Sequence, residues 1–385
     1  MGGDTHLHVI SFDIPYPANY GGVIDVFYKV RALHGLGVRV ILHCFEYGGR
    51  TKAAELEAFC ERVYYYRRDM SLVRHLSVTP FIVGSRRDRR LLDNLLADGY
   101  PILFEGLHCC WYISHPKLRN RKKVIRMHNI EWNYYANLAI LERSLVRRLY
   151  FRVESWKLRL FEARNIRWAD EIFCISEMDC LYFEEERARS SVLIHPFHGN
   201  DDVTIRMGQP VGRNGLEPYV LFHGKLSVSD NEEAAVYLIL SVFSKIEVPL
   251  VIAGMSPSER LYSVARMFEH VTIIANPGER EMEELIRGAQ IHVVMSFQIS
   301  GMKLKLLNAL FRGRYCVVNE TAVESTGLES LCDIANEPEE IVAAIGRLID
   351  KPFTKKMVDE RRSLLLGSFN NKEHAAQIMR VIEAL

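Results

Sequence analysis

The chain has 385 residues, of which 48% are hydrophobic and 25% are charged, and its formal net charge is +1. This length fits two or three domains, and the composition is that of a globular protein rather than a disordered one. A net charge near zero excludes a general binder of nucleic acid. The beginning of the chain lacks a secretory-signal pattern and no segment has the roughly 20 apolar residues that cross a bilayer, so we predict a cytoplasmic protein.

A glycine pair joins the first predicted strand to the first predicted helix. Residues 8–12 predict a strand, Gly21 and Gly22 end the turn-rich loop that follows, and apolar residues keep a helical spacing as far as Leu33. Glycines at a strand-to-helix turn let a backbone come close to a ligand, and the N–H groups of the helix favour an anion such as phosphate. A tight turn without a ligand explains a glycine pair equally well.

The strand-and-helix pattern then runs through the chain in two series. In the first, helical patterns separate strands that are predicted at residues 8–12, 38–44, 63–66, 102–104, 124–127, 171–175 and 192–195. Irregular, polar residues at 199–217 predict a linker. In the second series, helices at 231–245, 257–268, 280–288 and 303–311 alternate with strands at 219–223, 250–253, 271–275, 291–295 and 315–318. The pattern predicts an α/β protein with two doubly wound parallel sheets.

Four segments in this framework resemble the landmarks of one enzyme family, in the family's order. They read HNIEWNYYANLA (128–139), ADEIFCISEMD (169–179), VLFHGKLSVSDNEEAA (220–235) and GMKLKLLNALFRG (301–313). The chain is therefore similar to retaining GT-B glycosyltransferases of family 4, also called group 1. The resemblance implies two Rossmann-like domains that face each other across a cleft. It makes residues 1–198 the acceptor domain, with the last helix, 369–385, packing back on it, and residues 218–368 the nucleotide-sugar domain.

The chemistry of sugar transfer asks the protein to neutralise the leaving diphosphate. Enzymes that the chain resembles do so with basic side chains and helix N-termini, and they need no metal. The sequence has no DxD motif at a strand end, and its eight scattered cysteines contain no CxxC pair, so no metal site is predicted. The resemblance implies a nucleotide-sugar donor as substrate, no separate cofactor, and a glycan or lipid-linked acceptor.

Basic residues of the second domain are expected to hold the donor. Lys225 follows the strand at 219–223 and Gly224, where the family usually places a basic side chain against the diphosphate; the alternative is a solvated turn lysine. The family's second basic position falls near Asp230 and Asn231, where Asn231 also fits a helix N-cap. Lys305 is then expected to supply the second positive charge.

The loop before the helix at 303–311 departs from the family pattern. Gly301 would let the backbone approach the phosphates. Where the family commonly has two glutamates eight positions apart, this chain has Ser300 and Asn308. An asparagine can still accept a hydrogen bond from a ribose hydroxyl, but without charge assistance. Weak activity or altered donor choice is therefore an alternative.

In the first domain, His128 directly follows the strand at 124–127. A histidine at the carboxyl end of a strand can hydrogen-bond a sugar hydroxyl or transfer a proton. Its match to the family's HNIE-like motif favours a catalytic role over a structural one. Glu131 is expected either to orient His128 or to cap the next helix.

Residues 143–167 combine eight basic residues with apolar ones at helical spacing. The favoured interpretation is a surface helix whose apolar side packs on the core. The alternative is docking on anionic lipid, which would suit a lipid-linked acceptor and place the protein at the inner membrane.

Other functions remain open at this level. A dinucleotide-dependent oxidoreductase would also begin with such a βαβ unit and could hold a ribose through Glu46, but the loop reads NYGGVIDV and lacks GxGxxG. A nucleotide-sugar epimerase shares the two-domain architecture and would convert its donor without an acceptor. A catalytically weak nucleotide-sugar-binding protein is the third alternative.

Overall fold

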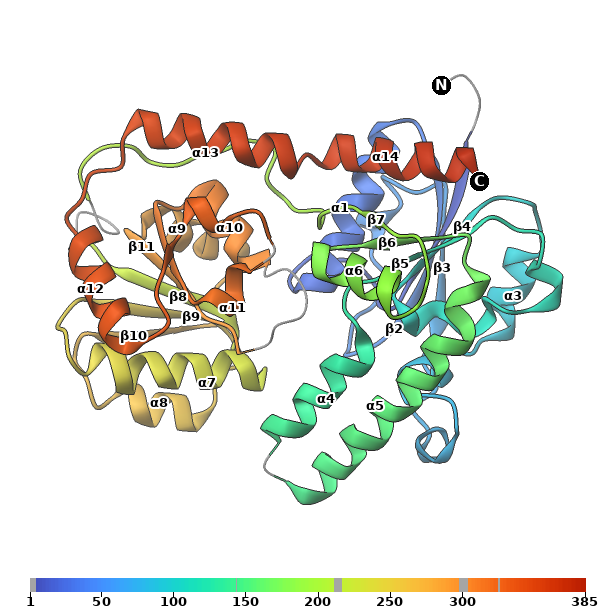
Figure 1. The fold of residues 1–385 in the computed structure, drawn as a ribbon, viewed down its shortest axis with the longest axis horizontal. Helices are drawn as coiled ribbons and strands as arrows, with labels where there is room; N and C mark the ends of the chain where they lie inside the picture. Colours follow the sequence, from blue (N-terminus) through green and yellow to red (C-terminus); the bar gives the residue numbers. More distant parts are fainter. Residues whose placement is uncertain (1–4, 143, 211–216, 298–303, 325) are drawn as a thin grey trace. The chain divides into compact units, whose positions relative to one another are not determined.

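The computed structural model describes residues 5–142, 144–210, 217–297, 304–324 and 326–385. The chain divides into two compact units, Met1–Gly199 with Phe369–Leu385, and Asn200–Ser368. Each unit is built on one parallel sheet with helices packed against it (Figure 1). The predicted α/β class with two doubly wound sheets is confirmed.

The first unit has a seven-stranded sheet with the order β3-β2-β1-β4-β5-β6-β7. All seven strands predicted from the sequence are present. They are β1 (His6–Ser11), β2 (Arg39–Glu46), β3 (Arg62–Arg67), β4 (Ile102–Glu105), β5 (Lys123–Arg126), β6 (Glu171–Cys174) and β7 (Val192–Leu193). The strand order reverses between β1 and β4, which pair in parallel. Open α/β sheets bind ligands at the carboxyl ends of the strands beside such a reversal.

Helices cover this sheet on both faces, so most strand residues are buried. The helices of the unit are α1 (Gly21–Gly35), α2 (Phe81–Gly84), α3 (Arg89–Leu95), α4 (Glu131–Leu141), α5 (Leu145–Asn165), α6 (Glu177–Glu185) and α14 (Asn371–Ala384), with short 3-10 helices η1 (Ala54–Leu56), η2 (Leu72–Leu76), η3 (Leu107–Tyr112), η4 (Pro116–Leu118) and η5 (Ile166–Trp168). Val26 and Val30 of α1 share one apolar core with Ile378 and Ile382 of α14. The last helix of the chain is thus part of the first unit.

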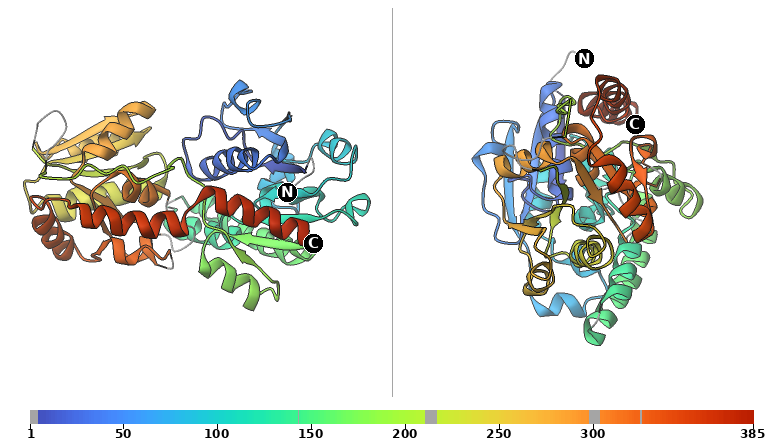
Figure 2. Two further views of the ribbon diagram at one scale, coloured as in Figure 1. Left: turned by 90° about the horizontal axis from the view of Figure 1, so that it is seen from above. Right: turned by 90° about the vertical axis from the view of Figure 1, so that its left-hand side faces the viewer.

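Helices α4 and α5 pair side by side and extend away from the sheet, as Figure 1 shows, and Figure 2 gives two further views of this arrangement. Arg148 fixes the turn between them, because its Nε and Nη2 atoms donate to the carbonyl oxygen of Glu142 at 3.1 and 2.9 Å.

The second unit has a six-stranded sheet with the order β10-β9-β8-β11-β12-β13, which reverses between β8 and β11. Its strands are β8 (Val220–Lys225), β9 (Leu250–Met255), β10 (Val271–Ala275), β11 (Ile291–Val294), β12 (Tyr315–Val318) and β13 (Asp333–Ile334). The first five of these were predicted. The sixth was not, because two residues are too short to show a pattern.

The helices of the second unit are α7 (Ser229–Tyr237), α8 (Glu259–Ala265), α9 (Glu279–Gly288), α10 (Leu304–Arg312), α11 (Glu320–Val323), α12 (Pro338–Leu348) and α13 (Lys355–Ser368), with a π-helical segment η7 (Leu238–Phe243) and the 3-10 helix η8 (Glu329–Leu331). The prediction that Asn231 caps the helix is wrong. The helix begins at Ser229 after Val228, and Val228 has no side chain that could cap it.

The segment 199–217 was expected to be a linker, but the described part of it after residue 199 is hydrogen-bonded to the second unit. The N–H of Thr204 donates to the carbonyl oxygen of Phe311 at 2.9 Å, and Gly208 forms an isolated β-bridge with Phe353. Residues 200–210 therefore belong to the second unit, while 211–216 lie outside the described residues.

The chain leaves the first unit and returns to it at one place. The ring Nε2 of His198 lies 2.8 Å from the carbonyl oxygen of Phe369, and Nδ2 of Asn371 donates to the carbonyl oxygen of His198 at 2.7 Å. These bonds tie the outgoing and returning segments together.

Candidate functional site

Charged side chains gather in the first unit where its strand order reverses. Glu105 and Arg126 are the last residues of β4 and β5, and His128 follows β5 by two residues. Asp25 and Lys29 lie one turn apart on α1, the helix that follows β1. Parallel strands bring their carboxyl ends to one edge of the sheet, which is why residues far apart in sequence meet here.

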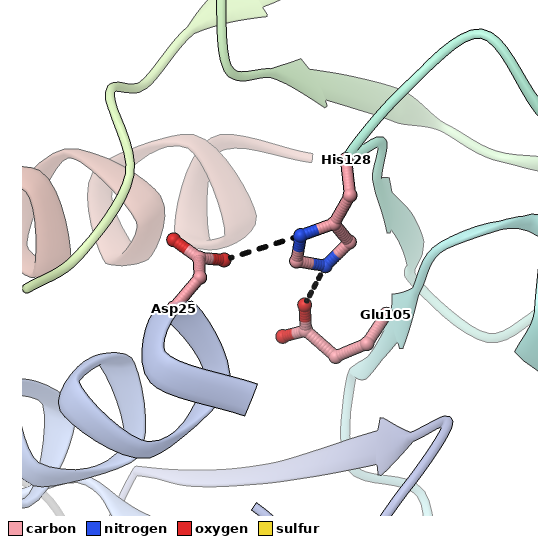
Figure 3. A group of neighbouring side chains, drawn as sticks. All are labelled: Asp25, Glu105 and His128. Carbon is pink, nitrogen blue, oxygen red and sulfur yellow. Dashed lines mark hydrogen bonds and ion pairs between the residues drawn. The ribbon is translucent and has the colours of Figure 1, made fainter. Parts of the chain in front are cut away.

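The His128 ring is held between two carboxylates (Figure 3). Its Nε2 lies 2.9 Å from Oε2 of Glu105, and its Nδ1 lies 3.7 Å from Oδ2 of Asp25. Because a carboxylate oxygen accepts, Nε2 donates to Glu105. The Phe12 ring packs edge-on against the imidazole, with 5.5 Å between centroids. The His128 side chain remains 12% exposed, so the ring is fixed in orientation while part of it reaches the surface.

Two buried cations balance the carboxylates. Nζ of Lys29 lies 2.7 Å from Oδ2 of Asp25 and 2.9 Å from Glu105. Arg126 donates through Nη2 to Oδ1 of Asp25 at 3.2 Å, and the N–H of Phe197 donates to the same oxygen at 2.7 Å. Burial alone would raise the pKa of Asp25, but the charges of Arg126 and Lys29 outweigh it and hold that pKa well below its ordinary value.

Asp25, Glu105 and His128 also have the chemistry of a metal-binding group. Among the described residues, one ligand atom from each lies within 4.8 Å of the others. However, the Lys29 ammonium contacts both carboxylates, and Arg126 contacts the remaining oxygen of Asp25. The side chains of Lys29 and Arg126 therefore occupy the positions in which a metal ion would contact these carboxylates. The residues present suit an internal ion-pair network better than a metal site.

The glycine pair begins α1, and packing explains one of its members. A Cβ on Gly22 would come within 2.5 Å of Cζ of Phe12, the ring that packs against His128. Gly22 is therefore required for that packing, whether or not an anion binds. Gly21 is the exposed first residue of the helix, and Tyr20 before it makes no side-chain cap.

Glu131 lies at the start of the helix that follows His128. It is the buried first residue of α4, and its Oε1 lies 3.7 Å from Nδ1 of His108. The prediction that Glu131 orients His128 is wrong, because Glu105 and Asp25 fill that role. Burial, with the nearby carboxylate of Glu162, raises the pKa of Glu131 to about 8.

In the second unit, the side-chain amide of Asn231 connects Lys225 and Lys305, the two lysines expected to bind the donor. Lys225 is the exposed last residue of β8, and its carbonyl oxygen accepts from Nδ2 of Asn231 at 3.0 Å. Oδ1 of Asn231 accepts from Nζ of Lys305 at 3.0 Å, and that ammonium also donates to the carbonyl oxygen of Met295 at 3.2 Å. A Cβ on Gly224 would lie 3.2 Å from the Asn231 side chain. Gly224, Lys225 and Lys305 thus lie together at the strand-order reversal.

Asp230 joins the same helix terminus to the end of β11. Its Oδ1 accepts from the N–H of Phe297 at 3.1 Å, and the Ser296 hydroxyl donates to its Oδ2 at 3.4 Å. Asp230 thus lies near the position where the family usually has its second basic residue. The positive charge at the N-terminus of α7 comes instead from Lys305 on α10.

Asn308 is half-buried on α10. Its Oδ1 accepts from Nδ2 of Asn200 at 3.0 Å, and Oδ1 of Asn200 accepts in turn from Nε of Arg312. The Asn308 carbonyl therefore has a partner within its own unit. Ser300 and Gly301, expected to contact the donor, lie outside the described residues.

Solved structures are similar over the whole chain. Sucrose-phosphate synthase from Thermosynechococcus elongatus has 16% identity and a TM-score of 0.70, over 99% of this chain and 98% of that one. Anabaena HepE in complex with UDP and glucose has 12% identity and a TM-score of 0.67, over 99% and 100%. A glycosyltransferase from Rickettsia africae has 13% identity and a TM-score of 0.63, over 100% and 99%.

Residues 217–351 match the family model of group 1 glycosyl transferases, and this range contains Lys225, Lys305 and Asn308. The chain has the GT-B fold, and its residues 217–351 are similar to group 1 glycosyl transferases. A curated relative, an uncharacterised 44.6 kDa protein in the cps region of Klebsiella pneumoniae, is 24% identical over 378 residues, which cover 92% of this chain and 91% of the relative.

This GT-B protein has a histidine near Lys225 and Lys305 that was not predicted from the sequence. His223 is buried on β8 directly before Gly224, and neither of its ring nitrogens has a hydrogen-bond partner among the described residues. Burial, together with the charge of Lys305, lowers the pKa of His223 to about 4. The ring is therefore neutral near pH 7 and can donate one hydrogen bond and accept another. His223 ends the strand predicted at 219–223, and a strand end is the signal that also singled out His128.

The buried Glu131 of the GT-B protein predicts a pH-dependent stability. Its pKa of about 8 exceeds the ordinary value of 4.5, so between these values the folded protein binds more protons than the unfolded one. Stability is then lost as the pH rises from about 4.5 to 8. Glu131→Gln, which stays neutral, should gain on the parent by up to about 1.4 kcal/mol for each pH unit in this range.

Urea unfolding at several pH values, followed by tryptophan fluorescence, measures this difference. The matched control is Glu177→Gln, because Glu177 is the exposed first residue of α6. The control should show no such trend. A parallel pH dependence of the Glu131→Gln variant and the parent would mean that Glu131 is ionised in the folded state.

Proposed function

We propose that this protein transfers a sugar from a nucleotide-sugar donor to a glycan or lipid-linked acceptor, with retention at the anomeric carbon and without a metal. The observation that carries the proposal is the pair Lys225 and Lys305, joined through Asn231 at the first turn of α7 within the group 1 domain. Positive side chains at a helix N-terminus are suited to a diphosphate.

Similar proteins support the choice of donor and pathway. Anabaena HepE was solved with UDP and glucose, and a trehalose-6-phosphate protein from E. coli was solved with UDP-2-fluoro glucose. The Klebsiella relative is described as lying in the cps region. These names favour a nucleotide-activated sugar and a role in polysaccharide synthesis.

In the proposed reaction, the bond between the anomeric carbon and the diphosphate oxygen breaks, and the diphosphate leaves with the electron pair. Lys225, Lys305 and the N-terminus of α7 stabilise the charge that develops on it. An acceptor oxygen forms the new bond to the anomeric carbon and releases its proton. We assign the binding of this hydroxyl, and the acceptance of its proton, to Nδ1 of His128, the nitrogen that carries no proton when Nε2 donates to Glu105.

A screen of uridine, guanosine, adenosine and thymidine nucleotide-sugars by thermal shift and donor hydrolysis tests the proposal. A true donor should stabilise the protein by about 2.7 kcal/mol at a concentration 100 times its Kd. Failure of all four classes to bind would contradict it. Conversion of a donor without an acceptor would instead indicate an epimerase. Tight binding without turnover would indicate a catalytically weak nucleotide-sugar-binding protein. In that protein, the hydrogen bond between Asn308 and Asn200 would keep Asn308 from binding the ribose.

Removal of the lysines should weaken donor binding. Lys225→Ala and Lys305→Ala are each expected to cost about 1–3 kcal/mol in calorimetric titration with the donor, the scale of hydrogen bonds to charged groups. Lys245→Ala is the matched control, because Lys245 is a lysine of the same unit whose Nζ pairs with Glu339 at 2.6 Å. If all three variants bind alike, the diphosphate does not bind at these lysines.

Chelation should leave the reaction intact. Because basic side chains rather than a metal are proposed to neutralise the diphosphate, the transfer rate in EDTA should equal the rate without it. The rate is measured again after adding magnesium or manganese. Loss of transfer in EDTA with recovery on adding either ion would show that a metal takes part.

A further inference from the structure

Helix α5 presents an apolar surface to solvent. We name Leu145, Val146, Leu149, Val153 and Trp156 the apolar stripe. Their exposed fractions range from 42% for Val153 to 80% for Val146. At about 100° per residue, these five positions span roughly one third of the helix circumference. The prediction that the apolar side of this helix packs on the core is therefore wrong for the stripe.

The opposite face of α5 is buried and largely polar. Lys157 pairs with Glu154 at 2.8 Å, and Oε2 of Glu154 accepts from the N–H of Phe81 at 2.6 Å. The Ser155 hydroxyl donates to the carbonyl oxygen of Trp132 at 2.7 Å. These bonds fix the rotation of the helix, because turning the stripe inward would break them and leave buried charges unpaired. The exposure of the stripe is thus built into the fold.

A second apolar segment lies beside the stripe. Around η2 the exposed residues are Leu72, Val73, Leu76 and Val78. Nζ of Lys157 donates to the carbonyl oxygen of His75 at 3.0 Å, and the His75 ring stacks on Phe81 at 3.8 Å. Lys157 lies one helical turn from Val153, so these bonds hold the segment next to α5. We name the stripe and these four residues together the apolar patch.

The exposed charged residues of α5 are all basic. The acidic residues of α5 are Glu154 and Glu162, and both are buried, whereas its exposed charged residues are Arg147, Arg152, Arg159 and Arg164. A helix with leucine, valine and tryptophan flanked by arginines is typical of helices that lie in the interface of an anionic membrane. Among the residues that the structure describes, no helix has the length and apolar character to cross a bilayer.

We propose that the apolar patch docks the first unit on a membrane surface that contains anionic lipid, with α5 lying in the plane of the interface. Apolar side chains then enter the boundary between headgroups and acyl chains, and the arginines meet the lipid phosphates. The inference rests on one surface of the first unit and does not depend on the proposed transfer reaction. Large exposed apolar areas on soluble chains mark such interaction sites.

Sedimentation of the full chain with vesicles tests the proposal. Vesicles of equal parts phosphatidylglycerol and phosphatidylcholine should bind the protein, and vesicles of phosphatidylcholine alone should bind it about tenfold less or weaker. The triple variant Leu145→Ser/Leu149→Ser/Trp156→Ser should partition about tenfold less or weaker than the parent. Met267→Ser in the second unit, where Met267 is 66% exposed, is the matched control and should bind as the parent does.

The contribution of the arginines is measured separately, by the affinity for anionic vesicles and by its dependence on salt. Arg152→Gln and Arg164→Gln should each weaken binding to the anionic vesicles about fivefold and reduce its dependence on salt. Trp156 emission should shift to shorter wavelength with the anionic vesicles, and Trp156→Phe should remove most of that shift while retaining binding. Circular dichroism and thermal unfolding check that each variant is folded.

Equal partitioning of the parent and the folded triple variant would overturn the proposal. So would concentration-dependent self-association that the triple variant abolishes, without binding to either vesicle, since the patch would then be an interface between copies of this chain. Equal binding to both kinds of vesicle would overturn the anionic-lipid assignment.

Discussion

Asp25→Asn should lower the free energy of unfolding of the first unit by about 3–5 kcal/mol, the scale for breaking a buried ion pair on one side. The variant removes the carboxylate that pairs with Arg126 and leaves Lys29 paired with Glu105 alone. All four tryptophans, at 111, 132, 156 and 168, lie in this unit. Urea unfolding followed by tryptophan fluorescence therefore reports on the first unit.

The exposed Asp93 provides the matched control, and Asp93→Asn should change the same free energy by no more than about 0.5 kcal/mol. If Asp25→Asn is as mild as the control, Lys29 and Arg126 reach water in the folded protein.

The second large effect is expected at His128 and rests on the proposed function. His128→Ala should lower kcat for transfer by about 10²–10⁴, the usual contribution of a positioned acid or base. Donor affinity should stay unchanged, because the donor lysines belong to the second unit. Single-turnover transfer and calorimetric titration measure the two quantities.

His34→Ala is the control, since His34 is exposed at the end of α1. It should leave both kcat and donor affinity near those of the parent. If His128→Ala keeps the parental kcat but lowers the free energy of unfolding, then His128 is a structural member of the ion-pair network.

The strands could be predicted because parallel strands covered on both faces are continuous apolar runs. Residues 40–45 and 315–318 show this pattern, and both are buried. The candidate site could be predicted only where residues directly follow such a run, as His128 and Lys225 do. Asp25 and Lys29 escaped notice because an acid and a lysine four residues apart on a helix look like an exposed pair.

The largest error concerns α5. Periodicity correctly indicates that Leu145, Leu149 and Trp156 share a face, but it cannot tell what covers that face. The packing is decided by Glu154 and Lys157, whose partners come from residues 75–81 and could not be identified from the sequence. Helix ends were similarly uncertain where the cap lacks a side-chain signal, as at Val228.

The bonds at His198 have a consequence for modularity. Since His198 is hydrogen-bonded to both Phe369 and Asn371, the points of exit from and return to the first unit are neighbours. In the chain, the second unit is an insertion within the first. Its two connections, after residue 199 and before residue 369, start from neighbouring points of the first unit. Joining residue 199 to residue 369 by a short loop would restore an uninterrupted first unit, with α14 still attached. An insertion whose ends meet can be exchanged for another without rebuilding its host, so under the proposed function the unit that binds the donor could be replaced while the unit that binds the acceptor is kept.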